Sequence, residues 1–258
     1  MSIKRASNRA NLPVRSFLSV IACLLACTLT SACVTVNVPS MTDGIIGEGT
    51  PTDMNYQVDT YNEVRSSIFC DIEYYSQPSD TVTLRIQPNL VEYIEIKVIN
   101  GVLYIDSTKN FQWSDETPVL TVSTPSLVAV TISGAGTFTA HDTIASDSFS
   151  LRVSGAANAT AELDVDKLYL NITGASDNIT FSGRADTADI LVSGAATINA
   201  LSLQTRETSI DLSGFGSIKV SCSGSLSINA SGAGQIEYRG TPALDINDSG
   251  VVDIRQAD

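Results

Sequence analysis

Apolar and polar residues alternate along most of the chain from residue 58 onward. In "TVTLRIQP" (81–88) and "YIEIKVING" (93–101) aliphatic residues stand at every second position, and "GVLYIDS" follows across an Asn-Gly turn. A period of two places alternate side chains on the core face of a β-strand. No long segment of this region shows the period of a helix. We therefore predict an all-β domain.

Seven copies of one pattern fill the C-terminal half, each with Ser-Gly or Thr-Gly between two short alternating runs. The first copy is "VTISGAGTFTA" (130–140), and the glycines recur at intervals of 18 to 21 residues. The paired residues are Ser133 and Gly134, Ser154 and Gly155, Thr173 and Gly174, Ser193 and Gly194, Ser213 and Gly214, Ser231 and Gly232, and Ser249 and Gly250.

Apolar residues keep constant places relative to these glycines. The fourth residue before the glycine is aliphatic in every copy, and the second before it is apolar except at Asp248 in the last copy. The fourth residue after the glycine is apolar except in the third copy, where the apolar residue slips by one to Ile179; this slip predicts a local bulge. The first of these rows comprises Val130, Leu151, Leu170, Ile190, Ile210, Ile228 and Ile246.

This constant phase favours a single-stranded parallel β-helix over a meander of hairpins, because only a stacked coil places like residues on like. We expect about seven coils of three short strands each, preceded by a β-rich N-terminal part. Glycine would occupy the corners because it tolerates a positive φ. The corner Ser and Thr hydroxyls would bond turn amides. The polar Asp248 would help to cap the last coil.

The N-terminus has the three parts of a secretory signal: basic residues, the apolar run "FLSVIACLLA", and small residues ending at Cys33. "LTSAC" (29–33) resembles a bacterial lipobox, which predicts a signal peptide over residues 1–32 and a lipid on Cys33. The alternative is ordinary cleavage after Ala32. Acylation would hold the protein at a membrane without a transmembrane helix.

Residues 33–57 are rich in Gly, Pro, Thr and Ser and predict a flexible tether, followed by one domain over residues 58–258. Cleavage would remove four basic residues and no acidic one, leaving 11 Lys+Arg against 28 Asp+Glu, a formal charge of −17. Such a charge argues against nucleic acid as a partner. The two cysteines of the domain, Cys70 and Cys222, should lie several coils apart and stay unpaired.

Candidate chemistry is sparse. Asp164, Asp166, Asp186 and Asp189 are the nearest approach to the clustered carboxylates of a β-helix enzyme, and the alternative is that they are solvated surface residues. His141 is the single histidine. We expect no catalytic residue, metal site or cofactor. Aromatic residues concentrated in the N-terminal third would either stack on a ligand or cap the solenoid: Tyr74, Tyr75, Tyr93, Tyr104, Phe111 and Trp113.

The opening "VDTYNEVRSSIFCDIEYYSQPSDTVTLRIQPNLVEYIEIKVINGVLYI" and the "SGAG", "SGFG" and "SGAG" corners at Ser133, Ser213 and Ser231 resemble the bacterial head GIN domain family over residues 58–258. Members of that family carry the label of autotransporter adhesins. The resemblance implies a right-handed β-helix in a bacterial, extracytoplasmic protein.

We therefore expect a non-catalytic binding, adhesion or scaffolding module in the bacterial envelope. Its partners would be the membrane, through the lipid on Cys33, and a glycan or protein ligand. We expect it in the outer membrane, facing either the periplasm or the cell exterior. A carbohydrate-active enzyme and an envelope signalling accessory are the alternatives, and three carboxylates meeting in one groove would favour the enzyme.

Overall fold

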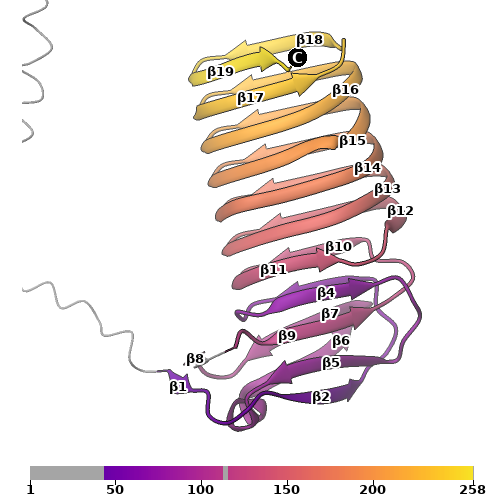
Figure 1. The fold of residues 1–258 in the computed structure, drawn as a ribbon, viewed down its shortest axis with the longest axis vertical. Helices are drawn as coiled ribbons and strands as arrows, with labels where there is room; N and C mark the ends of the chain where they lie inside the picture. Colours follow the sequence, from indigo (N-terminus) through magenta and orange to yellow (C-terminus); the bar gives the residue numbers. More distant parts are fainter. Residues whose placement is uncertain (1–43, 113–115, 258) are drawn as a thin grey trace, which may run out of the picture. The chain divides into compact units, whose positions relative to one another are not determined.

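The computed structural model describes residues 44–112 and 116–257, and nearly all of this part is β-structure (Figure 1). The exception among the described residues is a 3-10 helix, η2 (Pro88–Tyr93), which inserts the fully buried Leu90 into the core. The predicted all-β class and the parallel solenoid are both confirmed. The predicted signal peptide and Cys33 lie outside the described residues.

The N-terminal part mixes parallel and antiparallel pairing. Strands β2 and β5 pair antiparallel, as do β5 with β9 and β6 with β7, whereas β3 and β4 pair parallel with β7 and β9. A short pair, β1 with β8, is separate from the main sheet. The bounds are β1 (Ile45–Ile46), β2 (Thr52–Gln57), β3 (Glu63–Ser66), β4 (Asp71–Tyr75), β5 (Thr81–Ile86), β6 (Ile94–Ile99), β7 (Val102–Ser107), β8 (Phe111–Gln112) and β9 (Val119–Ser123).

The folded part begins earlier than predicted. Residues 44–57 were assigned to the tether, but β1 and β2 lie there, and all six residues of β2 are in register with β5. Met54 and Tyr56 are the half-buried members of that strand. Because β2 is an edge strand with few apolar residues, its alternation is too short to stand out from the Gly- and Pro-rich sequence around it.

The solenoid proper runs from β10 to β19, and its coils lie one above another along the axis (Figure 1). The seven corners delimit about six turns, slightly fewer than the seven coils expected. The strands are β10 (Ala129–Ile132), β11 (Ala135–Ala140), β12 (Ile144–Val153), β13 (Ala156–Ile172), β14 (Ala175–Val192), β15 (Ala195–Leu212), β16 (Phe215–Ala230), β17 (Ala233–Arg239), β18 (Ala243–Asp248) and β19 (Val251–Gln256).

Like residues stack on like in the predicted rows. Val130 pairs with Leu151, and the row continues without a break to Ile246. The predicted irregularity of the third copy is also confirmed, because the register shifts before Ile179 on both sides of β14. The aliphatic residues of the inner coils are buried and form one continuous core with the N-terminal part.

A central coil is one long strand instead of three short ones. Strands β13 to β16 have 16 to 18 residues each and are interrupted only at the Ser-Gly or Thr-Gly corner. The backbone bends elsewhere without losing its ladder: Gly183, with φ 94°, lies at such a bend in β14, and a register shift lies just before it. Bulges and a positive-φ glycine therefore turn the coil where separate strands were expected.

The corner glycines have a different role from the one predicted. Positive φ occurs at other glycines, including Gly136, Gly183 and Gly234, but at none of the seven corner positions. The requirement is instead for close approach, since a Cβ atom on Gly155 would lie 1.7 Å from the carbonyl oxygen of Gly134. The same conflict repeats at each corner above it, with the carbonyl oxygen of the preceding corner glycine 1.9 to 2.2 Å away.

Backbone carbonyls, rather than the corner hydroxyls, bond the turn amides. The amide of Ala175 donates to the carbonyl of Gly155 at 2.9 Å, and that of Ala195 donates to Gly174 at 3.0 Å. The corner Ser and Thr side chains are exposed in a row, and the one side-chain bond found among them is a long contact of 3.5 Å from Thr173 to the carbonyl of Val153.

The last coil is polar, and its strand β18 is left uncovered at the end of the solenoid. All six residues of β18 are exposed, and Leu244 and Ile246 remain 46% and 43% exposed. The carboxylate of Asp248 accepts a hydrogen bond from the amide of Gly250 at 2.9 Å, which fixes the final corner. An inward-row carboxylate of this kind disfavours the addition of another apolar strand.

Candidate functional site

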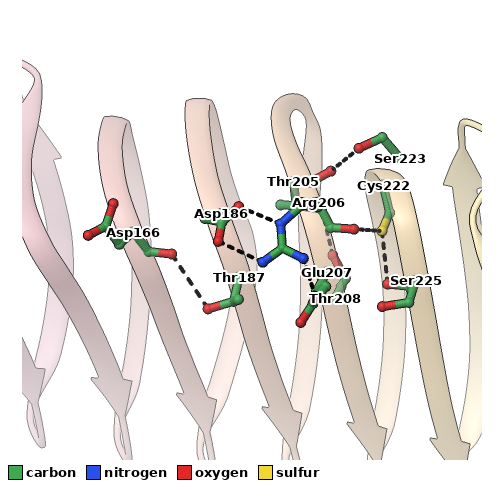
Figure 2. Close-up of polar contacts among 10 residues, drawn as sticks. All are labelled: Asp166, Asp186, Thr187, Thr205, Arg206, Glu207, Thr208, Cys222, Ser223 and Ser225. Carbon is green, nitrogen blue, oxygen red and sulfur yellow. Dashed lines mark hydrogen bonds and ion pairs between the residues drawn. The ribbon is translucent and has the colours of Figure 1, made fainter.

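Two of the four acidic residues singled out from the sequence, Asp164 and Asp186, are paired with arginines of the next coil. Asp164 pairs with Arg184, and both oxygens of Asp186 accept bonds of 2.8 Å from Arg206. Arg206 also contacts Glu207, and Figure 2 shows how its guanidinium lies between the two carboxylates. Parallel stacking explains these pairs, because residues about twenty positions apart come side by side.

These contacts keep the charges in their ionised forms. The hydrogen bonds from Arg206 hold the pKa of Asp186 below its usual value, and the carboxylates of Asp186 and Glu207 raise the pKa of Arg206. The bond from Asp164 likewise raises the pKa of Arg184. A carboxylate held ionised in this way is unsuited to act as a general acid, which needs a raised pKa.

The other two acidic candidates do not complete a catalytic cluster. The backbone carbonyl of Asp166 accepts a 3.5 Å contact from the Thr187 hydroxyl, while Asp189 stacks between Tyr169 and Ser209 in an outward-facing row. Within residues 44–112 and 116–257, no three His, Cys, Asp or Glu side chains gather in a way that could hold a metal ion.

A shallow groove of about 360 Å³ lies on the face that carries Asp189, across strands β13 to β16. Each of the four strands contributes outward-facing residues to it, so the groove follows the coil stack. Its principal side chains are Lys167, Tyr169, Thr187, Asp189, Glu207, Ser209, Ser225 and Ser227.

The groove combines one aromatic ring with hydrogen-bonding groups that have no protein partner. Tyr169 is 40% exposed. The side chains of Lys167, Tyr169 and Asp189 form no hydrogen bond or ion pair within the described part of the chain. They therefore differ from the adjoining Arg206 and Asp186, whose charges are already matched. Such a groove offers both an apolar surface and several polar groups to a ligand.

Sequence reasoning missed Tyr169. The signal was nevertheless present, since the fifth residue before each corner glycine is Ser, Asp or Ala in the other copies and Tyr only at position 169. A bulky aromatic residue at an otherwise small or polar, outward-facing position predicts a local specialisation of the surface.

Trp113 lies outside the described residues, and several of the other aromatic residues of the N-terminal third are engaged within the protein. Tyr74 is fully buried and donates to the carbonyl of Thr124 at 2.9 Å. Tyr75 stacks on His141 with 4.7 Å between ring centroids. The ammonium of Lys109 lies 4.9 Å from the ring centroid of Tyr93. These contacts support a structural role for the cluster.

Both cysteines of the domain are buried and free, as predicted. Cys222 donates to the carbonyls of Arg206 and Ser225, at 3.3 and 3.1 Å (Figure 2). Cys70 lies near the N-terminal end of the solenoid, beside Ser66. Among the residues that the structure describes, no helix is long and apolar enough to cross a membrane.

Solved structures share this architecture. A "putative adhesin" from Bacteroides fragilis has a TM-score of 0.74 and 21% identity, covering 83% of this chain and 100% of that chain. A "putative lipid binding protein" from Parabacteroides distasonis gives 0.68 and 19%, covering 83% and 99%. A "putative adhesin" from Parabacteroides merdae gives 0.66 and 18%, covering 84% and 100%. At these identities the likeness shows the fold.

A search of curated proteins finds no match. The family profile described as "Putative auto-transporter adhesin, head GIN domain" matches residues 60–242, which include most of the solenoid and the whole groove. The resemblance seen in the sequence is thus confirmed at the level of the family. The chain belongs to the head GIN domain family, a family of adhesin-like extracytoplasmic domains.

Proposed function

We propose that this protein is a non-catalytic binding module of the bacterial envelope, which attaches to extracellular material through the outward face of its solenoid. The observation that carries this proposal is the groove on β13 to β16, where Lys167, Tyr169 and Asp189 present unpaired polar groups beside an exposed ring. This combination of an apolar surface with a few free polar groups suits ligand recognition by side chains on a rigid scaffold.

The pairing of the neighbouring carboxylates supports binding over catalysis. Asp164 and Asp186 are engaged by arginines, and Glu207 contacts Arg206. Glycoside hydrolysis uses two carboxyl groups in different protonation states on opposite sides of the scissile bond. Asp189 is the one carboxylate among the groove-lining residues without such a partner, so a reacting pair is missing from this described surface.

The proposal includes attachment to the outer membrane through a lipid on Cys33. The residue follows a signal-like apolar run and small residues, as in a bacterial lipobox. Two or more acyl chains would hold the domain stably at the membrane, and the intervening segment would give it freedom to reach a ligand.

The anchor is tested by labelling cells with a palmitate analogue and comparing the native chain with Cys33→Ala. We expect label on the native chain and none on the variant. Protease treatment of intact cells then reports which side of the membrane the domain occupies. Label that persists in Cys33→Ala, or is absent from the native chain, would refute the lipid anchor.

Binding is tested with intact cells on surfaces coated with mucin or extracellular polymer. Cells producing the protein should be retained more than cells lacking its gene, and purified protein added in excess should compete. Equal retention of the two strains on every surface, together with no binding by the purified protein, would refute the binding function. Cleavage of an extracellular polymer by the purified protein would favour the enzymatic alternative.

A further inference from the structure

The groove beside Tyr169 has features that specify the class of its ligand, and this argument rests on the function proposed above. On successive strands, Tyr169 is followed by Asp189, then Ser209, then Ser227. A second row on the same face runs from Lys167 through Thr187 and Glu207 to Ser225. The hydrogen-bonding groups therefore repeat along the axis at the coil spacing of about 4.8 Å.

The ligand must be recognised by side chains alone. The backbone N–H and C=O groups of β14 and β15 are taken up by parallel ladders on both sides. A peptide cannot add to this face as an extra strand, because strand addition needs an unpaired sheet edge. What remains for a ligand is a ring to stack on and a line of hydroxyl, ammonium and carboxylate groups.

Charge narrows the ligand further. Among the groove-lining residues that the structure describes, Lys167 is the cation and Asp189 the carboxylate without a charged partner, whereas Glu207 is paired with Arg206, so the groove itself carries little net charge. The mature chain as a whole would be strongly acidic, with a formal charge of −17 after signal cleavage. Polyanions such as nucleic acids and uronate polymers are therefore repelled.

We infer that the groove binds a neutral saccharide chain, with Tyr169 stacking on one sugar ring and the side chains of Lys167 and Asp189 hydrogen-bonding to its hydroxyl groups. A sugar ring presents C–H groups on its face and hydroxyl groups at its edge, which match an aromatic platform flanked by polar side chains. On the neighbouring coils, the hydroxyl groups of Ser209, Ser225 and Ser227 would be within reach of further sugars of the same chain.

The chain contains a matched control for the aromatic platform. Phe215 is another exposed aromatic residue of the solenoid, at 64% exposure, and it stacks between Ala195 and Ala233 outside the groove. Because both rings are exposed, truncation to alanine should leave the fold intact in each case. Thermal unfolding of every variant verifies this before binding is compared.

The test uses the full mature protein purified in mild detergent and a panel of immobilised neutral oligosaccharides, including glucose, xylose, mannose and N-acetylglucosamine oligomers, with uronate oligomers alongside. We expect at least one neutral oligosaccharide to bind. Tyr169→Ala should weaken that binding at least about tenfold. Tyr169→Phe, which keeps the ring, and Phe215→Ala should each stay within about twofold of the native protein.

The inference is overturned if no neutral oligosaccharide of the panel binds, if uronate oligomers bind more tightly, or if Tyr169→Ala binds like the native protein. The cell-retention experiment separates this failure from failure of the proposed function. If producing cells are retained but the protein binds no saccharide, the proposed binding function is supported and only the inference of a neutral saccharide ligand is refuted.

Discussion

The carbonyl oxygen of Gly134 occupies the place that a Cβ atom on Gly155 would need, at a separation of 1.7 Å. The same carbonyl oxygen also joins the two coils, because it accepts a hydrogen bond from the amide of Ala156 at 3.0 Å. Neither group can move without opening the ladder. The corner sequence is therefore set by contact between coils.

Gly155→Ala should destabilise the domain severely, by about 3 kcal/mol or more, because the added methyl group meets backbone on the neighbouring coil. The control is Gly216→Ala, where the nearest atom is the flexible Cδ1 of Leu212 at 3.0 Å and the cost should be much smaller. Urea unfolding followed by circular dichroism measures both. Equal midpoints for the two variants would contradict this account of the corner.

The row from Val130 to Ile246 allows the effect of burial on stability to be compared at equivalent positions of different coils. Ile210 is 1% exposed between two coils, whereas Ile246 is 43% exposed on the last. Ile210→Ala should cost about 2–5 kcal/mol, the usual range for a buried aliphatic residue, and Ile246→Ala less than about 1 kcal/mol. The same unfolding assay applies, and a large loss for Ile246→Ala would show that the last coil is covered in solution.

Alkaline pH should destabilise the domain because the buried Cys70 and Tyr61 resist losing their protons in the folded state. Burial raises the pKa of Cys70 from 9.0 to about 12, and that of Tyr61 from 10.0 to about 12. The folded state thus retains protons that the unfolded chain releases. The resulting stabilisation is complete below about pH 9 and is lost as pH rises toward 12, at no more than about 1.4 kcal/mol per pH unit for each group.

Urea midpoints measured between pH 8 and 11.5 test this expectation. Cys70→Ala removes one of the two titrating groups, so its midpoint should fall less steeply with pH than that of the native chain. A native midpoint that is constant over the whole range would show that these groups do not titrate differently on folding.

The ion pair between Asp186 and Arg206 predicts that the pKa of Asp186 changes when Arg206 is replaced. Because hydrogen bonds from Arg206 lower the pKa of Asp186, any stabilisation from this carboxylate is present above its ordinary pKa of 3.8 and is lost as pH falls through the lowered value. Arg206→Gln should raise the pKa of Asp186 toward 3.8. Carboxyl-carbon NMR reports it directly.

Arg255→Gln is the matched control for this titration. Arg255 pairs with Glu237 at 3.0 Å on a later coil, so its loss should raise the pKa of Glu237 and leave that of Asp186 where it was. An Asp186 titration that is the same with and without Arg206 would mean that the pair does not persist in solution. Both arginines are exposed, so the effect on unfolding should be small and weaker still at high salt.

Much of the solenoid follows from sequence alone because parallel stacking imposes one residue type on each row. The rows through Ile210 and Leu212 and the bulge before Ile179 were predictable in this way. The role of the corner glycines was not, since the distance from Gly155 to Gly134 depends on how closely two coils approach. The start of the domain was also missed, because β2 is stabilised by pairing with distant β5.

The candidate site, like the fold, could be predicted from the sequence only in part. The charge pairs of Asp164 and Asp186 follow from residues one coil apart, but only once the register of the polar positions is known. The groove depends on outward-facing residues, on which the core places no constraint. Tyr169 is visible in the alignment of the copies as a departure from the pattern, and such departures mark where the outward surface differs from the regular rows.

Because each coil repeats the register of the one before it, the protein can evolve by gaining or losing whole coils. Duplication or deletion of one whole coil, from one corner glycine to the next, would leave the rows beside the corners in phase. The solenoid can thus become longer or shorter by one coil at a time, while the structures at its two ends stay the same. The outward face of the solenoid can therefore be lengthened without any change to the fold of the remaining coils.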